Sequence, residues 1–296
     1  MRVAILGCGY VGLELCRQLT ATGHDVVGVR RSDEGLAAVE GAGGDAVQAD
    51  VTEPDSLSAV PDADALVFAA SSGGRGAEAA RGVYVDGLET VIDHFARRES
   101  PPDRLVYTSS TGVYGDHGGD WVDESTSLDP TTAKTRVLAE AEATALTADD
   151  RGIDGTVARF AGLYGPDRYR LERYLGGPVT EGYLNMVHRD DAAGTVAHLL
   201  EGDLARGEAV LVVDDEPVDK WAFADWLAAQ CGEPAPPKRT TAERLADDDL
   251  SETAKRRIRT SKRCSNDYLR ELGYEFRYPT YREGYLEAIE AHLDRT

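Results

Sequence analysis

Short apolar runs recur along the first 160 residues of this chain, and stretches with helical or loop character separate them. The runs occupy residues 3–6, 26–29, 46–48, 65–69, 105–108 and 156–159. Because continuous apolar strands that alternate with helices are covered on both faces, this pattern predicts a parallel sheet. Right-handed crossovers make such a sheet a doubly wound α/β fold, in which ligands bind beyond the carboxyl ends of the strands.

The hydrophobic pattern changes after about residue 165. A loop rich in Arg, Tyr and Gly covers residues 167–182. A helix, a strand and a second helix are then predicted at 190–200, 209–213 and 217–230. Pro217 suits the first turn of the second helix, because the N–H that proline lacks is unpaired there in any case. A polar stretch at 232–260 precedes a loop and the helices that end the chain.

The first predicted strand leads directly into the motif Gly7-Cys8-Gly9-Tyr10-Val11-Gly12. A helical pattern follows at once, so the motif has the strand–turn–helix context of a dinucleotide site. Gly7 permits the tight turn, Gly9 lets a pyrophosphate approach the backbone, and Gly12 lets the helix pack against the strand. The helix N-terminus then presents N–H groups to the phosphates, and we assign Tyr10 and Val11 of the motif to the cofactor site.

These patterns together predict a dinucleotide-binding domain with a small lobe. We expect residues 1–165, completed by 185–230, to form the dinucleotide-binding domain. Residues 166–184 and 231–296 are expected to form a lobe that binds the substrate and closes over the cleft.

The second strand ends in Arg30, Arg31 and Ser32, where an NAD site usually carries an acid that binds the ribose hydroxyls. Arginine donates to a 2′-phosphate, so these residues predict a preference for NADP(H). The alternative is that Arg30 and Arg31 are solvated charges on the surface and do not bind the cofactor. Asp33 and Glu34 follow closely and could still reach a ribose, which keeps NAD(H) as an option.

Further candidates lie at the ends of the next strands. Asp50 and Val51 are placed to meet an adenine ring, and Ala69 and Ala70 leave room for a nucleotide. Four hydroxyl residues follow the fifth strand at 108–111; we assign Thr108 to the cofactor and expect the others to meet a substrate oxygen. A turn that caps its own backbone is the alternative.

Acidic residues outnumber basic ones by 53 to 32 and give a formal net charge of −21. Nucleic-acid binding needs the opposite sign, so we exclude a nucleic-acid partner. The acidic residues are spread along the chain, as in proteins from high-salt cytoplasms, where screening weakens self-repulsion and net charge maintains solubility. An acidic face for a basic partner is the alternative.

The four cysteines are scattered, without a CxxC pair, and the six histidines show no ligand spacing. We therefore predict no metal site and unreactive thiols. The chain has no run of about 18 apolar residues and no secretory signal pattern. We expect a cytoplasmic protein that does not bind membranes.

Several motifs resemble those of the extended short-chain dehydrogenase/reductases, the NAD-dependent epimerase/dehydratase group. Residues 108–115 are similar to the SSxxVYG motif of that group, and 159–166 to its YGP turn beside the nicotinamide. Further similar segments lie at 84–87, at 121–124 with Pro130, and at 185–191. The resemblance implies a Rossmann fold and a nicotinamide cofactor. It also implies a small polar or sugar-derived substrate.

Catalysis in that group rests on a Ser or Thr after the fifth strand and on a Tyr-x-x-x-Lys pair. The resemblance assigns the first role to Ser110, which would hold the substrate oxygen. Counted forward from the following proline, the Tyr and Lys positions hold Lys134 and Leu138. Counted back from the Ala-Glu pair, they hold Thr132 and Arg136, and Arg136 could still bind a ribose. The tyrosine is absent in both registers.

Other departures from the group concern single positions. Asp86 replaces an asparagine, and Thr111-Gly112 replaces the Asp-Glu pair of dehydratases. Lys134 could donate the missing proton if burial and the nicotinamide charge favoured its neutral form. An exposed helix charge is the alternative for this lysine.

The resemblance also places substrate contacts at Ser110, Thr111, Tyr114, Tyr164, Asn185 and His188. Tyr114 has core packing as its alternative, and His188 is expected to be structural or to contact substrate rather than act as a base. Arg159 is expected in an interior network rather than in the chemistry.

Two functions are consistent with these residues. The first is an NAD(P)-dependent oxidoreductase or epimerase-like enzyme with an unconventional proton transfer. The second is a dinucleotide-binding redox sensor or partner module without catalysis. An ionisable group within about 3 Å of the substrate oxygen would favour the enzyme. By analogy with the family, helices near 79–98 and 132–148 would pair two copies into a homodimer.

Overall fold

The computed structural model describes residues 1–73, 76–248 and 250–295, which fold as two compact units. The first unit comprises residues 1–113, 130–160 and 189–212, and the second comprises 114–129, 161–188 and 213–296. The sequence analysis assigned residues 114–129, 161–165, 185–188 and 213–230 to the first domain, and they fall in the second unit.

A seven-stranded parallel sheet forms the centre of the first unit, with the strand order β12-β7-β5-β4-β1-β2-β3. Its strands are β1 (Arg2–Leu6), β2 (Asp25–Arg30), β3 (Asp45–Gln48), β4 (Ala65–Phe68), β5 (Arg104–Ser110), β7 (Asp154–Phe160) and β12 (Ala209–Val212). Each apolar run named above lies in one of these strands or extends one residue beyond it. The doubly wound fold predicted from the sequence is thus confirmed.

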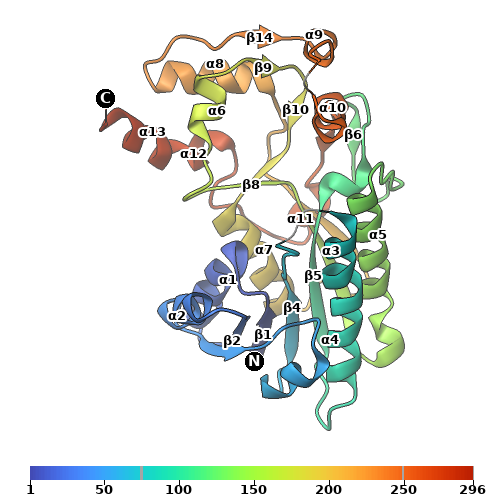
Figure 1. Cartoon of the computed structure of the whole chain (residues 1–296). Helices are drawn as coiled ribbons and strands as arrows, with labels where there is room; N and C mark the ends of the chain where they lie inside the picture. Colours follow the sequence, from blue (N-terminus) through green and yellow to red (C-terminus); the bar gives the residue numbers. More distant parts are fainter. Residues whose placement is uncertain (74–75, 249, 296) are drawn as a thin grey trace. The chain divides into compact units, whose positions relative to one another are not determined.

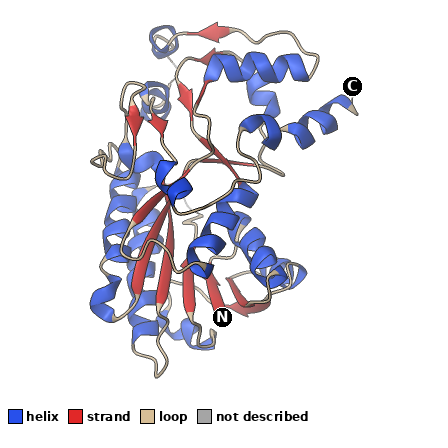
Figure 2. Ribbon diagram, turned by 180° about the vertical axis from the view of Figure 1, so that it is seen from behind, coloured by secondary structure: helices blue, strands red, loops and turns tan. Residues whose placement is uncertain are grey.

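Helices cover both faces of this sheet. They are α1 (Tyr10–Ala21), α2 (Asp33–Gly41), α3 (Ala77–Arg81), α4 (Gly87–Ala96), α5 (Ala133–Leu146) and α7 (Arg189–Glu201). Helices α1, α2 and α7 lie on one face, and α3, α4 and α5 lie on the other (Figures 1 and 2). An apolar core lies on the α4–α5 face, in which Leu88, Ile92 and Phe95 are fully buried against the strands.

Shorter helical turns join these elements: η1 (Pro54–Ala59), η3 (Thr111–Tyr114) and η4 (Ala148–Arg151) are 3₁₀ turns, and η2 (Gly82–Asp86) is a π-helical turn. The π-helical turn lies between α3 and α4, so the helix expected at 79–98 is interrupted rather than regular.

Short strand pairs and helices make up the second unit. The pairs are β6 (Trp121–Val122) with β15 (Arg263–Cys264), β8 (Gly162–Tyr164) with β11 (Met186–His188), β9 (Val179–Thr180) with β14 (Lys238–Arg239), and β10 (Tyr183–Leu184) with β13 (Val218–Asp219). The helices are α6 (Leu171–Leu175), α8 (Lys220–Gln230), α9 (Thr241–Leu245), α10 (Glu252–Arg259), α11 (Asp267–Glu271), α12 (Tyr281–Gly284) and α13 (Leu286–Leu293). Aromatic side chains dominate its core, including Tyr164, Phe223 and Tyr285.

The prediction that Pro217 begins a helix is wrong. Helix α8 begins three residues later, at Lys220, because the Asp219 carboxylate accepts hydrogen bonds from the backbone N–H groups of Trp221 and Ala222 at 2.9 and 3.0 Å. Residues 218–219 instead pair with 183–184 as an antiparallel ladder. An acidic N-cap therefore sets the helix start, and the proline precedes it.

The described residues include no helix that is long and apolar enough to cross a membrane. They also contain no group of three His, Cys, Asp or Glu side chains that could hold a metal ion. The four cysteines are free thiols and are buried.

Candidate functional site

The glycine motif forms the turn between β1 and α1. Gly7 has a φ of +86°, and a Cβ at this position would lie 2.3 Å from the Cα of Ala70. Only glycine fits there, because a side chain would meet backbone in a conformation that L residues rarely adopt. A Cβ on Gly12 would lie 3.1 Å from the Ile5 Cγ2 atom, so the helix packs directly on the first strand.

The N-terminus of α1 has the polarity of an anion site. Gly9 is its N-cap and, as a glycine, makes no side-chain capping hydrogen bond. The first turn also contains no acidic residue. The helix dipole and its backbone N–H groups, including those of Val11, therefore remain available to a phosphate. These residues fit the pyrophosphate of a dinucleotide.

Arg30 lies beside the glycine motif. Its Nη1 atom donates to the Cys8 carbonyl at 3.3 Å and would lie 3.1 Å from a Cβ on Gly9. Within the described part of the chain Arg30 forms no ion pair, so its guanidinium keeps donors for an anion. The structure thus brings together the end of β2 and the start of α1, as the sequence analysis expected for a ribose phosphate.

Arg31 and Ser32 have partners that the sequence did not suggest. Arg31 Nη1 forms an ion pair with the Asp50 carboxylate at 3.2 Å, although the Arg31 side chain is 62% exposed. Ser32 is the N-cap of α2, and its hydroxyl accepts from the Gly35 N–H at 3.2 Å. Ser32, which the sequence analysis assigned to the cofactor site, therefore also caps the start of α2.

Asp50 follows β3 and acts as the counter-ion of Arg31. Partial burial acts to raise the pKa of Asp50, but hydrogen bonds from Thr52 and the charge of Arg31 hold that pKa below its usual range. Val51 beside it is buried, and it packs within 3.2 Å of the Cβ position of Gly87. Val51 thus has a packing role in addition to the adenine contact expected from the sequence.

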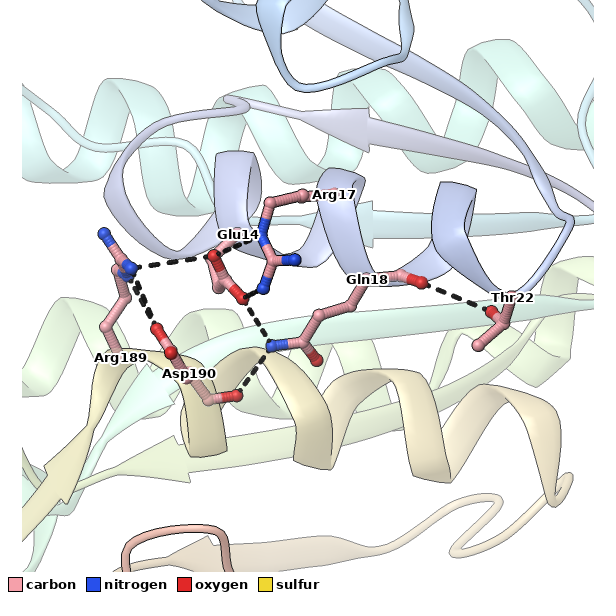
Figure 3. Close-up of polar contacts among 6 residues, drawn as sticks. All are labelled: Glu14, Arg17, Gln18, Thr22, Arg189 and Asp190. Carbon is pink, nitrogen blue, oxygen red and sulfur yellow. Dashed lines mark hydrogen bonds and ion pairs between the residues drawn. The ribbon is translucent and has the colours of Figure 1, made fainter. Parts of the chain in front are cut away.

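Glu14 links α1 to α7 through a polar network that the sequence analysis missed (Figure 3). Its carboxylate accepts from Arg17 Nε at 3.0 Å and from Gln18 Nε2 at 2.8 Å, and it lies 3.6 Å from Arg189 Nη2. Gln18 also donates to the Asp190 carbonyl at 2.9 Å. The sequence signal was an acid within the apolar face of a helix, since Glu14 is only 6% exposed.

The same network reaches the glycine motif. The Arg189 guanidinium lies 5.6 Å from the centre of the Tyr10 ring, a cation–π distance. Burial acts to raise the pKa of Glu14, but hydrogen bonds from Arg17 and Gln18 lower it below its usual range. An ionised Glu14 therefore holds the first turns of α1 and α7 together.

The hydroxyl residues at 108–111, at the carboxyl end of β5, have different roles. Thr108 Oγ1 donates to the Phe68 carbonyl of β4 at 3.2 Å, and Ser110 Oγ accepts from the Gly112 N–H at 3.2 Å. Ser110 therefore caps its own turn, and its hydroxyl hydrogen can still be donated to another oxygen. Thr111 is buried. Ala69 and Ala70 follow β4, which pairs in parallel with β5, so they lie at the same edge of the sheet as the hydroxyl residues.

Ser109 belongs to a buried ionic group rather than to the open edge. Its hydroxyl donates to Glu142 of α5 at 2.5 Å. Arg159 of β7 donates to the same carboxylate from Nε at 3.1 Å and from Nη2 at 2.8 Å. The interior network expected for Arg159 is confirmed.

The first turn of α5 contains the two positions where the family tyrosine was sought. Thr132 is the N-cap and forms a reciprocal capping box with Thr135. Lys134 is exposed, and its Nζ atom lies 5.8 Å from the centre of the Tyr84 ring. The burial that would favour a neutral Lys134 is absent, which removes the reason given for its acting as the proton donor.

The remaining expected substrate residues lie in the second unit. Tyr114, Tyr164 and His188 are at most 2% exposed, and Tyr164 stacks on Tyr285 with 4.9 Å between ring centres. The side-chain amide of Asn185 donates to the Lys262 carbonyl and accepts from the Cys264 N–H. Each of these residues therefore has an interior role within that unit.

Lys262 is a further buried group of the second unit that the sequence did not indicate. Its Nζ atom donates to the Gly115 carbonyl at 3.0 Å, and burial lowers the pKa of its ammonium group. The bond holds the turn after Tyr114 beside β15, in the same unit.

Comparisons with known proteins agree with this geometry. A family model described as NAD(P)H-binding matches residues 7–203. Protein YeeZ of Escherichia coli K12 is 30% identical over 287 residues, which cover 94% of this chain and 96% of that protein. The structure of a candidate NAD-dependent epimerase/dehydratase from Methylobacillus flagellatus is 31% identical, with a TM-score of 0.77 over 99% of this chain and 98% of that one. A 2-alkyl-3-oxoalkanoate reductase of Stenotrophomonas maltophilia is 28% identical over 77% of this chain and 74% of its own length.

Proposed function

This chain belongs to the NAD(P)H-binding family, in its epimerase/dehydratase type, and we propose that it is an oxidoreductase that reduces or oxidises a small polar substrate at a carbonyl carbon. The observation that carries the proposal is the N-terminus of α1, which has no side-chain cap, beside the guanidinium of Arg30, which forms no ion pair within the described residues. An epimerase-type reaction on a sugar-derived substrate uses the same hydride chemistry and is included in the proposal.

The residues of the first unit have separate tasks in holding the cofactor. The first turn of α1 binds the pyrophosphate, and Gly9 lets it approach the backbone. Ala69, Ala70 and Thr108 border the nucleotide at the carboxyl ends of β4 and β5. When bound, the nicotinamide supplies or accepts the hydride.

We further propose that NADP(H) is preferred to NAD(H). Arg30 offers a guanidinium without a carboxylate partner in the described chain, and a 2′-phosphate can receive two hydrogen bonds from such a group. Arg31 adds a second positive charge, which Asp50 partly balances. Asp33 and Glu34 in the first turn of α2 carry negative charges that repel a 2′-phosphate. We therefore expect NAD(H) to bind as well, more weakly than NADP(H).

Ser110 is proposed to orient the substrate. Its hydroxyl oxygen accepts from the Gly112 N–H, which directs its hydrogen toward another acceptor. A substrate carbonyl oxygen is such an acceptor. The similarity to a 2-alkyl-3-oxoalkanoate reductase supports a 3-oxo compound as the first substrate class to test.

The alternative is a dinucleotide-binding sensor without turnover. The absence of a tyrosine from α5 and the exposure of Lys134 favour it. Spectrophotometry of NADPH consumption with a panel of 3-oxo esters and keto sugars separates the two functions. We expect turnover that Ser110→Ala reduces at least tenfold with little change in NADPH affinity, since the serine contacts substrate rather than cofactor. NADPH binding without turnover of any member would support the sensor.

We also propose that the protein functions in concentrated salt, because a net charge of −21 is spread along a chain of 296 residues. Screening at high ionic strength reduces the self-repulsion of such a surface.

A further inference from the structure

We propose that the Tyr84 hydroxyl is the proton donor and acceptor of this site, with Lys134 as the residue that positions and polarises it. The proposal rests on the oxidoreductase function proposed above. It replaces the missing tyrosine of α5 with a tyrosine from a different helix, so that a Ser–Tyr–Lys set is assembled from three separate elements.

Tyr84 lies in the π-helical turn η2, where α3 passes into α4. Such turns are uncommon and occur frequently at functional sites, because the extra residue redirects a side chain. The Tyr84 ring packs against the apolar core, and its hydroxyl oxygen accepts from the Ser72 N–H at 3.4 Å. Ser72 follows β4, so the hydroxyl lies at the edge of the sheet where the cofactor is proposed to bind.

Lys134 and Ser110 border the same region of the first unit. The Lys134 ammonium lies 5.8 Å from the centre of the Tyr84 ring. The next residue, Thr135, has its methyl group 3.7 Å from the Cβ position of Gly112, and Ser110 Oγ lies 3.4 Å from that same position. A contiguous path therefore leads from Ser110 through the first turn of α5 to the face of Tyr84.

Tyr84 is the tyrosine of the first unit best suited to proton transfer. That unit contains three tyrosines: Tyr10, Tyr84 and Tyr107. Tyr10 belongs to the glycine motif and lies against Arg189. Tyr107 is 1% exposed, and burial, with a smaller effect of the Glu142 charge, raises the pKa of its phenol far above the usual range. Tyr84 is half-buried, so its hydroxyl can exchange a proton with substrate and solvent.

The proposed step is a balanced carbonyl reduction. The substrate carbon receives a hydride from NADPH as the reductant, and the C=O π pair moves onto the substrate oxygen. That oxygen takes the proton of the Tyr84 hydroxyl while Ser110 donates a hydrogen bond to it. The product is an alcohol, and the tyrosinate that remains regains a proton from solvent. The positive charge of Lys134 stabilises this transient anion.

The first test compares Tyr84→Phe with Tyr107→Phe in the full-length protein, each of which removes one hydroxyl and keeps the ring. With NADPH and ethyl 2-methyl-3-oxobutanoate as the probe, Tyr84→Phe should lower kcat by about 10²-fold or more, the usual contribution of general acid–base catalysis, at an unchanged NADPH Kd. Tyr107→Phe should keep the wild-type rate. A wild-type rate in Tyr84→Phe would overturn the proposal.

The second test needs no turnover. Tetranitromethane nitrates the phenolate form of tyrosine, and peptide mass mapping reports the rate at each tyrosine. We expect nitration of Tyr84 to be slowed severalfold by Lys134→Gln, restored by Lys134→Arg, and blocked by NADP⁺. Nitration of Tyr84 that is indifferent to both the lysine and the nucleotide would contradict the proposal, even if the probe ester is not a substrate.

The two proposals fail separately. If the wild-type protein binds no nicotinamide dinucleotide, the proposed function itself is wrong. If it binds NADPH and either test gives the contradicting result described above, only the role of this tyrosine is wrong.

Discussion

The guanidinium of Arg30 donates a hydrogen bond to the carbonyl of Cys8 at 3.3 Å, which fastens the end of β2 to the glycine motif. One side chain therefore lies beside both segments that we propose to bind the pyrophosphate and the ribose of a dinucleotide.

Replacing Arg30 is expected to weaken NADPH binding more than NADH binding. A hydrogen bond to a charged group contributes about 1.5–3 kcal/mol, so Arg30→Ala should raise the NADPH Kd by roughly 10- to 100-fold. NADH lacks the 2′-phosphate, and its Kd should change much less. Fluorescence titration measures both constants, with Arg97→Ala as the control, since Arg97 is an exposed residue of the α4 C-terminus. Equal losses for the two nucleotides would mean that Arg30 only supports the loop.

Glu14→Gln should destabilise the protein at neutral pH. The substitution removes the carboxylate that receives hydrogen bonds from Arg17 and Gln18, a loss of about 1–3 kcal/mol in the free energy of unfolding. Because the pKa of Glu14 is lowered in the folded state, its stabilising effect is present above the usual value of 4.5 and is lost as the pH falls through the lower folded value.

Urea unfolding of Glu14→Gln and the wild type at several pH values tests this dependence. The difference in stability should be constant between pH 7 and 5 and should narrow below pH 4.5. Glu40→Gln, at an exposed position of α2, serves as the matched control and should show no such narrowing. A difference that is independent of pH down to unfolding would argue against an ionised Glu14.

Glu142→Gln is expected to be the most destabilising of these substitutions. Glu142 and Arg159 are 1% and 5% exposed, and the substitution removes the carboxylate that Arg159 binds through Nε and Nη2, at a cost of about 3–5 kcal/mol for breaking a buried ion pair. The double variant Glu142→Leu with Arg159→Met should recover part of that loss, because no charge is then left buried. Thermal or urea unfolding measures the free energy of unfolding of each variant. An unchanged stability of Glu142→Gln would show that Glu142 and Arg159 are not a structural ion pair.

Much of the first unit could be predicted from short stretches of sequence. The strands and the turn at Gly7 depend on local apolar runs and on one backbone conformation, and both are visible within a few residues. The link between Glu14 and Arg189 could not be predicted, because the two residues are far apart in the sequence and meet only when α1 packs against α7. The start of α8 was missed because the side chain of Asp219 decides it, whereas the prediction relied on Pro217.

In the candidate site, too, residues with a local sequence signal could be predicted, and residues placed by contacts between distant segments could not. The sequence indicated Arg30 and Ser110 from their places at the carboxyl ends of two strands, β2 and β5. It gave no reason to choose Tyr84, because the family analogy predicts one long helix at 79–98 and does not indicate the π-helical turn that contains this residue. The distance of 5.8 Å between Lys134 Nζ and the Tyr84 ring joins residues 50 positions apart, which no local pattern reveals. The buried state of Tyr114 likewise depends on contacts within the second unit.

Salt is expected to stabilise the folded protein. With a net charge of −21, self-repulsion destabilises the compact state at low ionic strength, and the screening length falls from about 10 Å at 0.1 M salt to about 3 Å at 1 M. The melting temperature in differential scanning calorimetry should therefore rise between 0.1 and 2 M KCl, roughly the range over which screening becomes complete. An unchanged or lower melting temperature in KCl would contradict adaptation to salt.

The most direct measurement of the central claim is calorimetric titration of the wild-type protein with NADPH, NADP⁺, NADH and NAD⁺ in concentrated KCl. We expect one site per chain, with NADPH and NADP⁺ bound more tightly than their counterparts that lack the 2′-phosphate. Binding of none of the four, or tighter binding of NADH than of NADPH, would contradict it.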